Sequence, residues 1–416
     1  MKAYCSFIWI LMILFSLHGV TGVQVQSRKE MMTIDDNFPG GNIIVDSVKG
    51  KDIYIHHDLH DTERNWFYWY FRIKGASGST RTFHFTHPWQ QFSAINVVGV
   101  HGPAISRDGG ITWSWLGMEN ATGKSFTYTF SGQEKDVRFS MGMPYTQENL
   151  TSFLDRYKNN KHLDIATLAV TRKGRIVERI HVGNTEGNPK YRILLTARHH
   201  ACEMMTNYLL EGVIETVLGN AEQSAWLRKN VEFLVVPFVD KDGVEDGDQG
   251  KYRRARDHNR DYSEESIYAS TRAIRAYVPV WSDEKLAVML DLHCPYIAGK
   301  DHEQIHMVGL SSPGVSKQQE KFSSILQRTS ESGNGLPYQT SFNIPFGTSW
   351  NTVANYGKGK SISRWASELK EVKLASTLEF PYANASGKIV TQENARDFGR
   401  ILARSLYEYL LLLEKE

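Results

Sequence analysis

The stretch "RILLTARHHACE", Arg192 to Glu203, joins a short apolar run to two adjacent histidines, a cysteine and a glutamate. The run "RILLT" has the length and apolar content of a buried strand. Apolar residues then recur with helical spacing from about Cys202 to Leu218, and Gly219 suits a helix end. We therefore predict a strand, a polar turn and a helix. The polar cluster is either part of a metal site with partners elsewhere or an accidental group in a turn.

The same alternation of strand and helix extends over residues 145–416. Three further apolar runs read as buried strands, namely "VEFLVVPFV" (231–239), "LAVMLDL" (286–292) and "LASTLEF" (374–380). Helical patterns cover residues 263–277 and about Gln392 to Leu413. Near-continuous apolar strands between helices are typical of an α/β fold with a mixed, mostly parallel sheet covered by helices. Ligands of such folds bind beyond the carboxyl ends of the strands.

Residues 23–144 have a different sequence pattern. Short runs rich in β-branched and aromatic residues, such as "DIYIHH" and "WFYWYFRIK", are separated by clusters of Gly, Asp and Ser. This pattern predicts an N-terminal antiparallel β-sandwich domain. The α/β domain is then expected over residues 145–416.

Residues 1–22 read as a secretory signal peptide. Lys2 precedes the apolar run "FIWILMILF", small residues follow, and Glu30 is the first acidic residue. The run is shorter than the roughly 20 residues that span a bilayer. We expect a secreted or periplasmic protein with no stable membrane insertion after signal cleavage, the alternative being an uncleaved anchor.

Composition argues against nucleic acid as a partner. The 416 residues contain 48 Lys and Arg and 46 Asp and Glu, which are interspersed and give a formal net charge of +2. Of the three cysteines, Cys5 would leave with the signal peptide, so Cys202 and Cys294 provide no disulfide framework.

Polar side chains at three predicted strand ends point to a metal. His200 and Glu203 follow the first strand, His293 follows "LAVML", and Glu379 lies in the last strand. Two histidines and one glutamate form a zinc set that leaves one position for a water molecule. Glu379 would take the proton from that water as general base. We predict one Zn²⁺ per chain.

These motifs carry a resemblance. "ARHHACE", "DHNRDY", "DLH" and "TLEFPY", in this order, resemble the zinc carboxypeptidase family (carboxypeptidase A-like). The N-terminal half, with "GPAISRDGGITWSWLG" and "MPYT", resembles the β-domain of the cytosolic-carboxypeptidase branch. The resemblance implies the zinc carboxypeptidase fold, zinc on the two histidines and the glutamate named above, and the general base at Glu379.

The resemblance also implies roles for the loop "DHNR". Asn259 and Arg260 would hold the terminal carboxylate of the substrate, with Tyr356 as a further substrate-binding residue. Asp257 would hydrogen-bond to a zinc-ligating histidine and so orient its ring.

An upstream arginine would polarise the scissile carbonyl. Arg253 aligns best with the branch, and Arg254 and Arg256 are close rivals. The chain departs from the family pattern at Ala201-Cys202 and at Cys294, which removes no ligand. His199 is interpreted as a residue that ends the strand or supports a metal ligand without binding the metal itself.

The leading hypothesis is therefore a secreted zinc-dependent metallocarboxypeptidase. It would hydrolyse the C-terminal bond of a peptide or protein, with a zinc-activated water and a glutamate general base. An amidase or carboxypeptidase acting on cell-wall peptides is the alternative within the same fold. A carbohydrate-binding protein on an inactive scaffold is the alternative from another class, which loss of a ligand or of Glu379 would favour.

Overall fold

The computed structural model describes residues 31–62, 66–86, 97–333, 335–357 and 359–416. Residues 32–416 form one compact unit. The predicted signal peptide, residues 1–22, lies outside the described residues. Within the described part of the chain, no helix combines the length and the apolar character needed to cross a bilayer.

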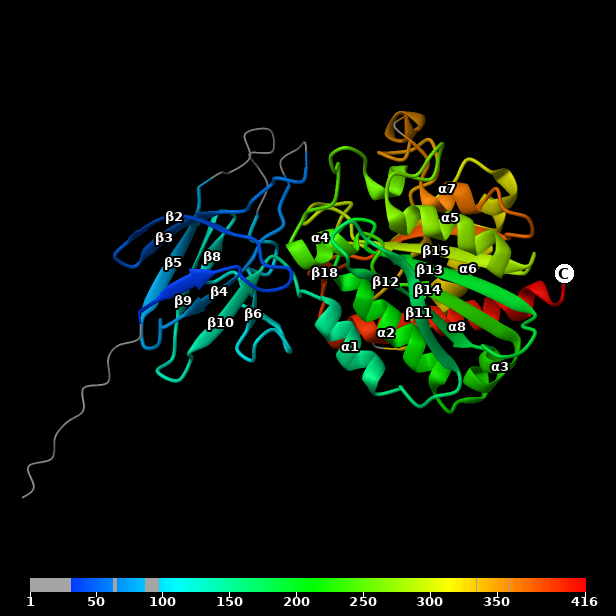
Figure 1. Ribbon diagram of the computed structural model, residues 1–416, viewed down its shortest axis with the longest axis horizontal. Helices are drawn as coiled ribbons and strands as arrows, with labels where there is room; N and C mark the ends of the chain where they lie inside the picture. Colours follow the sequence, from blue (N-terminus) through cyan, green and yellow to red (C-terminus); the bar gives the residue numbers. More distant parts are fainter. Residues whose placement is uncertain (1–30, 63–65, 87–96, 334, 358) are drawn as a thin grey trace, which may run out of the picture. The chain divides into compact units, whose positions relative to one another are not determined.

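The N-terminal part is a sandwich of two five-stranded sheets (Figure 1). One sheet has the order β1 (Thr33–Asp35), β4 (Tyr70–Lys74), β10 (Asp136–Ser140), β6 (Ala104–Ser106) and β7 (Ser114–Trp115). The other has the order β2 (Ile44–Lys49), β3 (Asp52–His56), β5 (Thr80–Phe85), β9 (Ser125–Thr129) and β8 (Ala121–Thr122). The sandwich is antiparallel as predicted, except that β3 and β5 pair in parallel.

Aromatic rings from both sheets fill this sandwich. The Phe83 ring from β5 lies 4.7 Å from that of Phe126 on β9, and the Phe126 ring lies 5.1 Å from that of Phe139 on β10. All three side chains are buried. We call the described residues from 32 to 140 the β-domain.

The second part is built on a seven-stranded sheet. Its order is β11 (Leu163–Val170), β12 (Ile176–Gly183), β14 (Val231–Val236), β13 (Tyr191–Ala197), β15 (Leu286–His293), β17 (Leu374–Glu379) and β16 (His306–Val308). The four strands from β14 to β17 are parallel, whereas β11, β12 and β16 add antiparallel edges. The predicted parallel character therefore holds for the centre of the sheet.

Helices cover both faces of this sheet (Figure 1). They are α1 (Gln147–Asp155), α2 (Met205–Leu218), α3 (Glu222–Asn230), α4 (Lys241–Asp246), α5 (Ala269–Ser282), α6 (Pro313–Glu331), α7 (Ile362–Ala366) and α8 (Gln392–Leu413). Alternate residues of β13 enter different cores, since Ile193 packs with α2 and α8 and Leu194 with α5 and α7. Such alternation is expected of a strand that is buried on both sides.

Two helices begin later than their sequence patterns indicated, and the one predicted from about Cys202 is α2, Met205–Leu218. The predicted helix at residues 263–277 is α5, Ala269–Ser282. The Asp261 carboxylate accepts hydrogen bonds from the backbone N–H groups of Ile267 and Tyr268. These bonds hold the preceding segment as a loop, which lies next to the site described below.

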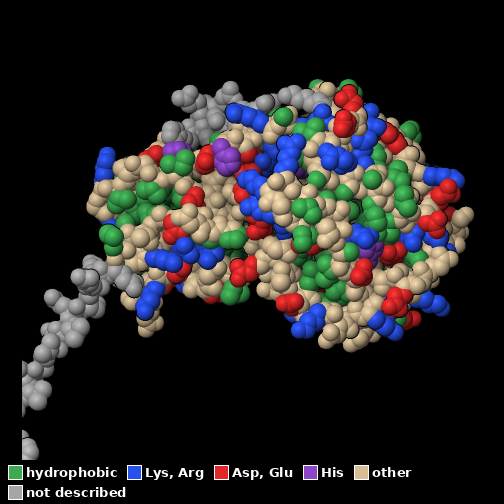
Figure 2. Space-filling view, in the orientation of Figure 1, with side chains coloured by type: hydrophobic (Ala, Val, Ile, Leu, Met, Phe, Trp, Pro, Cys, Tyr) green, Lys and Arg blue, Asp and Glu red, His purple; other side chains and the backbone are tan. Residues whose placement is uncertain are grey.

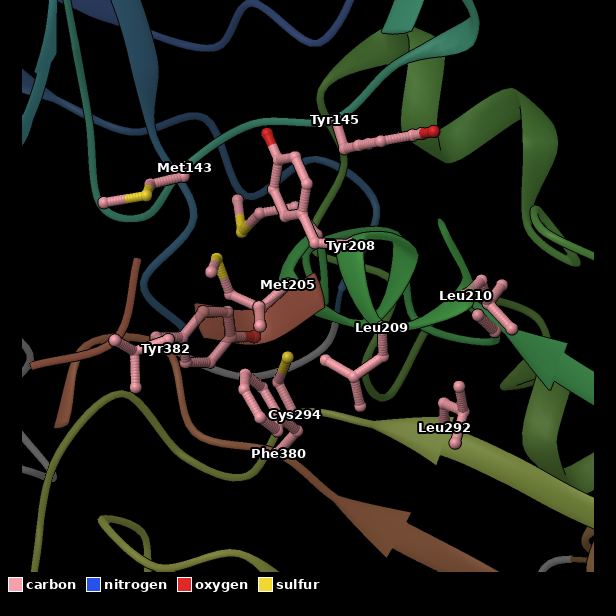
Figure 3. Close-up of a cluster of buried hydrophobic side chains, with 14 of the residues drawn as sticks. Met143, Tyr145, Met205, Tyr208, Leu209, Leu210, Leu292, Cys294, Phe380 and Tyr382 are labelled. Carbon is pink, nitrogen blue, oxygen red and sulfur yellow. The ribbon is translucent and has the colours of Figure 1, made fainter. Parts of the chain in front are cut away.

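Charged side chains of both signs lie on the surface, and apolar side chains fill the core. Figure 2 shows basic and acidic side chains interspersed over the visible face. In the core, Leu209 and Leu210 come from α2, Leu292 comes from β15, and Phe380 follows β17 (Figure 3). This apolar cluster reaches the strand ends, because Cys294 also belongs to it.

Candidate metal centre and active site

The predicted metal ligands come together at the carboxyl ends of neighbouring parallel strands. His200 and Glu203 lie in the turn between β13 and α2, and His293 is the last residue of β15. The three residues form one of the groups whose ligand atoms all lie within 4.8 Å of one another. The structure therefore unites side chains that are far apart in the sequence.

Their geometry suits a single metal ion. His200 Nδ1 lies 2.9 Å from Glu203 Oε1, His293 Nδ1 lies 2.9 Å from Glu203 Oε2, and the two Nδ1 atoms are 3.2 Å apart. Two donors on one tetrahedral zinc are separated by roughly 3.3 Å. Two imidazole nitrogens and one carboxylate are also a donor set that zinc prefers in catalytic sites. The residues present thus fit the predicted ion.

The outer nitrogen of each histidine is bound by a carboxylate. His200 Nε2 lies 3.2 Å from both carboxylate oxygens of Asp257, and His293 Nε2 lies 2.5 Å from Asp291 Oδ2. Such partners fix the ring orientation and make the inner nitrogen a better metal donor. Asp257 contacts His200, and the role that the resemblance gave to it stays a prediction.

The carboxylates of this cluster stay ionised. Burial alone would raise the pKa of Glu203, but the charges of His293, Lys251 and His200 hold that pKa well below its usual value. Burial likewise opposes ionisation of Asp257, and His200 outweighs it and lowers the pKa of Asp257. Glu203 is fully buried and charged, which is costly without a cationic partner.

A second group that could hold a metal consists of His199, Asp291 and His293. Both ring nitrogens of His199 already have partners, since Nδ1 lies 2.8 Å from Asp291 Oδ1 and Nε2 lies 2.8 Å from the Tyr262 hydroxyl. His199 is also fully enclosed. We therefore assign His199 to the support of Asp291 and not to the metal.

Glu379 lies beside the candidate ligands. It ends β17 and is paired in register with His293 of β15, so the two side chains share one face of the sheet. Its side chain is only 8% exposed, and Oε2 is buried without a hydrogen-bond partner in the described part of the protein. A buried, unpaired carboxylate oxygen next to the ligands is available to accept a proton.

The residues predicted to hold the substrate carboxylate lie on one side of the ligands. Asn259 Nδ2 is 3.1 Å from His293 Nε2. The Arg260 guanidinium donates to the backbone oxygens of Asn259 (2.8 Å) and Asn355 (3.3 Å) and lies 5.2 Å from the centre of the Tyr356 ring. Among the described residues, no carboxylate forms an ion pair with Arg260, so its charge is available to an anionic group.

Within the part of the chain that the structure describes, none of the three arginines that were candidates for polarising the scissile carbonyl is seen in contact with the candidate ligands. Arg253 donates to Asp248 at 2.6 Å and to Asp240, and Arg256 donates to Asp261 at 2.8 Å. Arg254 is exposed. The role that the resemblance gave to Arg253 stays a prediction, and the geometry shows its guanidinium in contact with carboxylates of the surrounding loops.

Two residues of the site were missed in the sequence. Asp291 precedes His293 by two positions in a strand, which places both side chains on one face and was a usable signal. Lys251 has its Nζ 2.8 Å from Glu203 Oε1, and a lone lysine in a charged loop gives no signal of this kind.

Comparison with known proteins shows which family and fold the chain resembles. Residues 150–277 match the zinc carboxypeptidase family. Cytosolic carboxypeptidase 6 of Caenorhabditis elegans is 26% identical over 275 residues, which cover 59% of this chain and 59% of that protein. Cytosolic carboxypeptidase 3 of Bos taurus is 27% identical over 44% of this chain and 19% of its own length. This chain thus spans three fifths or less of these relatives.

Solved structures show the same fold. A metallo-carboxypeptidase from Burkholderia cenocepacia superposes with a TM-score of 0.74 at 18% identity, over 92% of this chain and 100% of that chain. The metallo-carboxypeptidase from Pseudomonas aeruginosa, solved in complex with (2-guanidinoethylmercapto)succinic acid, has a TM-score of 0.71 at 17% identity, over 91% of this chain and 99% of that chain. The family predicted from the four motifs is thus the one whose model matches residues 150–277, and the solved structures bear out the predicted fold.

Proposed function

We propose that this protein is a secreted, zinc-dependent metallocarboxypeptidase that releases the C-terminal residue of peptides or proteins. The observation that carries the proposal is the convergence of His200, Glu203 and His293 beside Glu379, with Arg260 next to them. Every predicted ligand and the predicted base are present in the sequence. This favours an enzyme over a carbohydrate-binding protein on an inactive scaffold.

Each side chain of the site has its own role in the proposed reaction. Bound zinc would supply Lewis-acid chemistry, which polarises a carbonyl group and makes water more acidic. Glu379 accepts a proton from the attacking water at its carboxylate, whose Oε2 has no other partner in the described residues. Asp257 and Asp291 hold the two histidine rings in place.

Arg260 gives the site its preference for a chain end. A guanidinium can hold a carboxylate with two parallel charge-assisted hydrogen bonds. Because Asn259 lies against His293, a terminal carboxylate held by this pair would place the last peptide bond at the metal ligands. Internal bonds would lack that anchor.

We expect paired peptides to separate the exopeptidase from its alternatives. Wild type should cleave a peptide with a free C-terminal carboxylate and leave its amidated twin largely intact. Replacing Arg260 with alanine should lower kcat/KM for the free peptide by roughly ten- to a hundred-fold, because a charge-assisted hydrogen bond is lost. Product release is followed by mass spectrometry.

Arg275→Ala is the matched control. Arg275 also donates to its loop, at Ser266 Oγ (3.0 Å), but it lies outside the site. Equal cleavage of both peptides by wild type, or an unchanged preference in Arg260→Ala, would rule out the exopeptidase. Cleavage of cell-wall fragments alone would favour the wall amidase.

Export is proposed from the sequence of residues 1–22. We expect the protein recovered outside the cytoplasm to lack this segment, with a new N-terminus near Val23. N-terminal mass spectrometry of the exported protein measures this directly. Recovery only from the cytoplasm, or an exported chain that still begins at Met1, would contradict the proposal.

A further inference from the structure

Segment 251–256 offers four cations, and one of them reaches the candidate ligands. Arg253 and Arg256 are bound by carboxylates, and Arg254 is exposed. Lys251 instead extends to the metal centre, where its Nζ is 2.8 Å from Glu203 Oε1 and 2.8 Å from the backbone oxygen of Cys294. The cation beside the site is therefore a lysine.

Lys251 keeps donor capacity for a ligand. An ammonium group has three N–H donors. The contacts to Glu203 and Cys294 engage two of them. The lysine lies at the edge of a cluster of rings, with Nζ 5.9 Å from the centre of the Trp66 ring, and its side chain is 13% exposed. One N–H thus remains for a group that enters the site.

The backbone that carries Lys251 packs tightly against the ligand turn. Gly250 has a φ of +83°, and a Cβ at this position would come within 2.2 Å of the Ala201 backbone nitrogen. The neighbouring Gln249 is fully buried, and its Nε2 donates to Cys202 Sγ at 3.0 Å. The segment that carries Lys251 is therefore packed directly against the turn that holds His200 and Glu203.

The β-domain holds the same segment from the other side. Backbone N–H groups of Phe67 and Tyr68 donate to Gln249 Oε1 at 3.1 and 2.9 Å. The Asp61 carboxylate accepts from the Gly250 N–H at 2.8 Å. The Thr62 hydroxyl donates to the backbone oxygen of Lys251 at 2.8 Å. Such bonds fix the Lys251 backbone relative to the ligands.

We propose that Lys251, held in place by the β-domain, is the cation that faces the carbonyl oxygen of the scissile bond. This inference rests on the proposed function and assigns to a lysine the task that the resemblance gave to an arginine. As the water oxygen bonds to the carbonyl carbon, the π electron pair of the carbonyl moves onto its oxygen. The proton of the water goes to Glu379. Lys251 transfers no proton, and its remaining N–H stabilises the negative oxygen.

The test compares Lys251→Met, Lys251→Arg and wild type, all zinc-loaded, on the peptide with a free C terminus. Lys251→Met keeps the apolar stem and removes the ammonium group. We expect its kcat to fall by about 10²–10³-fold, as for the loss of one oxyanion donor, with a smaller change in KM. Lys251→Arg should recover at least about tenfold of that loss, because it restores a cationic donor. Zinc content should equal that of wild type in both variants.

A second arm tests the β-domain contact. Thr62→Val is nearly isosteric and removes the hydroxyl that donates to Lys251. It should lower kcat in the wild-type background and have no further effect in Lys251→Met, because residues that act through one another are not additive. Trp115→Phe is the control, since it removes another hydrogen bond of the β-domain, from Trp115 Nε1 to the Val390 oxygen (2.7 Å).

The possible results of these experiments separate failure of the Lys251 inference from failure of the proposed function. A wild-type kcat in Lys251→Met would overturn the inference and leave the proposed function intact. Loss of zinc from Lys251→Met would also overturn it, because the lysine would then only support Glu203. Failure of wild type to cleave any free-carboxylate peptide would refute the proposed function itself, and this inference with it.

Discussion

Glu379→Gln is expected to lower kcat by about 10²–10⁴-fold, the usual contribution of a general base. The amide has nearly the shape of the carboxylate but accepts no proton at neutral pH. Because Glu379 is not one of the three clustered ligand residues, zinc content should stay at the wild-type level. Steady-state kinetics and metal analysis on the same preparation give both numbers.

Glu211→Gln is the matched control for this change. Glu211 is also a buried glutamate, but it accepts from the Tyr145 hydroxyl at 2.8 Å, pairs with Arg396 and belongs to neither group of candidate ligands. Its kcat should stay near wild type. Unchanged turnover in Glu379→Gln would mean that another group is the base, and loss of zinc would mean that Glu379 belongs to the metal site.

Removing a ligand should have the largest effect on metal binding. His293→Ala deletes one of three donors and should weaken zinc affinity by more than the roughly 10–100-fold that loss of an outer partner costs. Asp291→Asn, which changes the partner of His293 Nε2, should fall within that range. Competition with a chromophoric chelator measures both affinities without any substrate.

His162→Ala controls for the loss of an imidazole. His162 Nδ1 lies 3.0 Å from the Gly183 oxygen, at the opposite end of the sheet, and its removal should leave zinc affinity unchanged. If His293→Ala bound zinc as tightly as wild type, the proposed ligand set would be wrong. A larger loss in Asp291→Asn than in His293→Ala would point to the His199 group instead.

Most of the sheet could be predicted because its central strands are buried on both faces. The runs around Ile193, Phe233 and Leu290 are apolar at successive positions, as is typical of short parallel strands that are covered on both faces. The last helix was predicted at about Gln392 to Leu413 from its apolar face, and the structure has it at Gln392–Leu413. The edge strands were missed for two reasons: β11 mixes exposed and half-buried residues, and β16 is only three residues long.

The site could be predicted where residue type alone limits the chemistry. Histidine and glutamate at strand ends suggest a metal, so His200, Glu203, His293 and Glu379 could be named as candidates, and the structure brings the first three together. The partners of these groups depend on tertiary contacts. Lys251 reaches Glu203 only because the loop that carries it is fixed against Ala201 and the β-domain, and no local pattern encodes that arrangement.

The most direct test of the central claim is anomalous scattering from a crystal of the zinc-reconstituted protein, with data on both sides of the zinc absorption edge. We predict one strong peak per chain, bound by His200, Glu203 and His293, at about 2.0–2.2 Å from the ligand atoms. A peak between His199, Asp291 and His293, or no peak among these residues, would contradict the account.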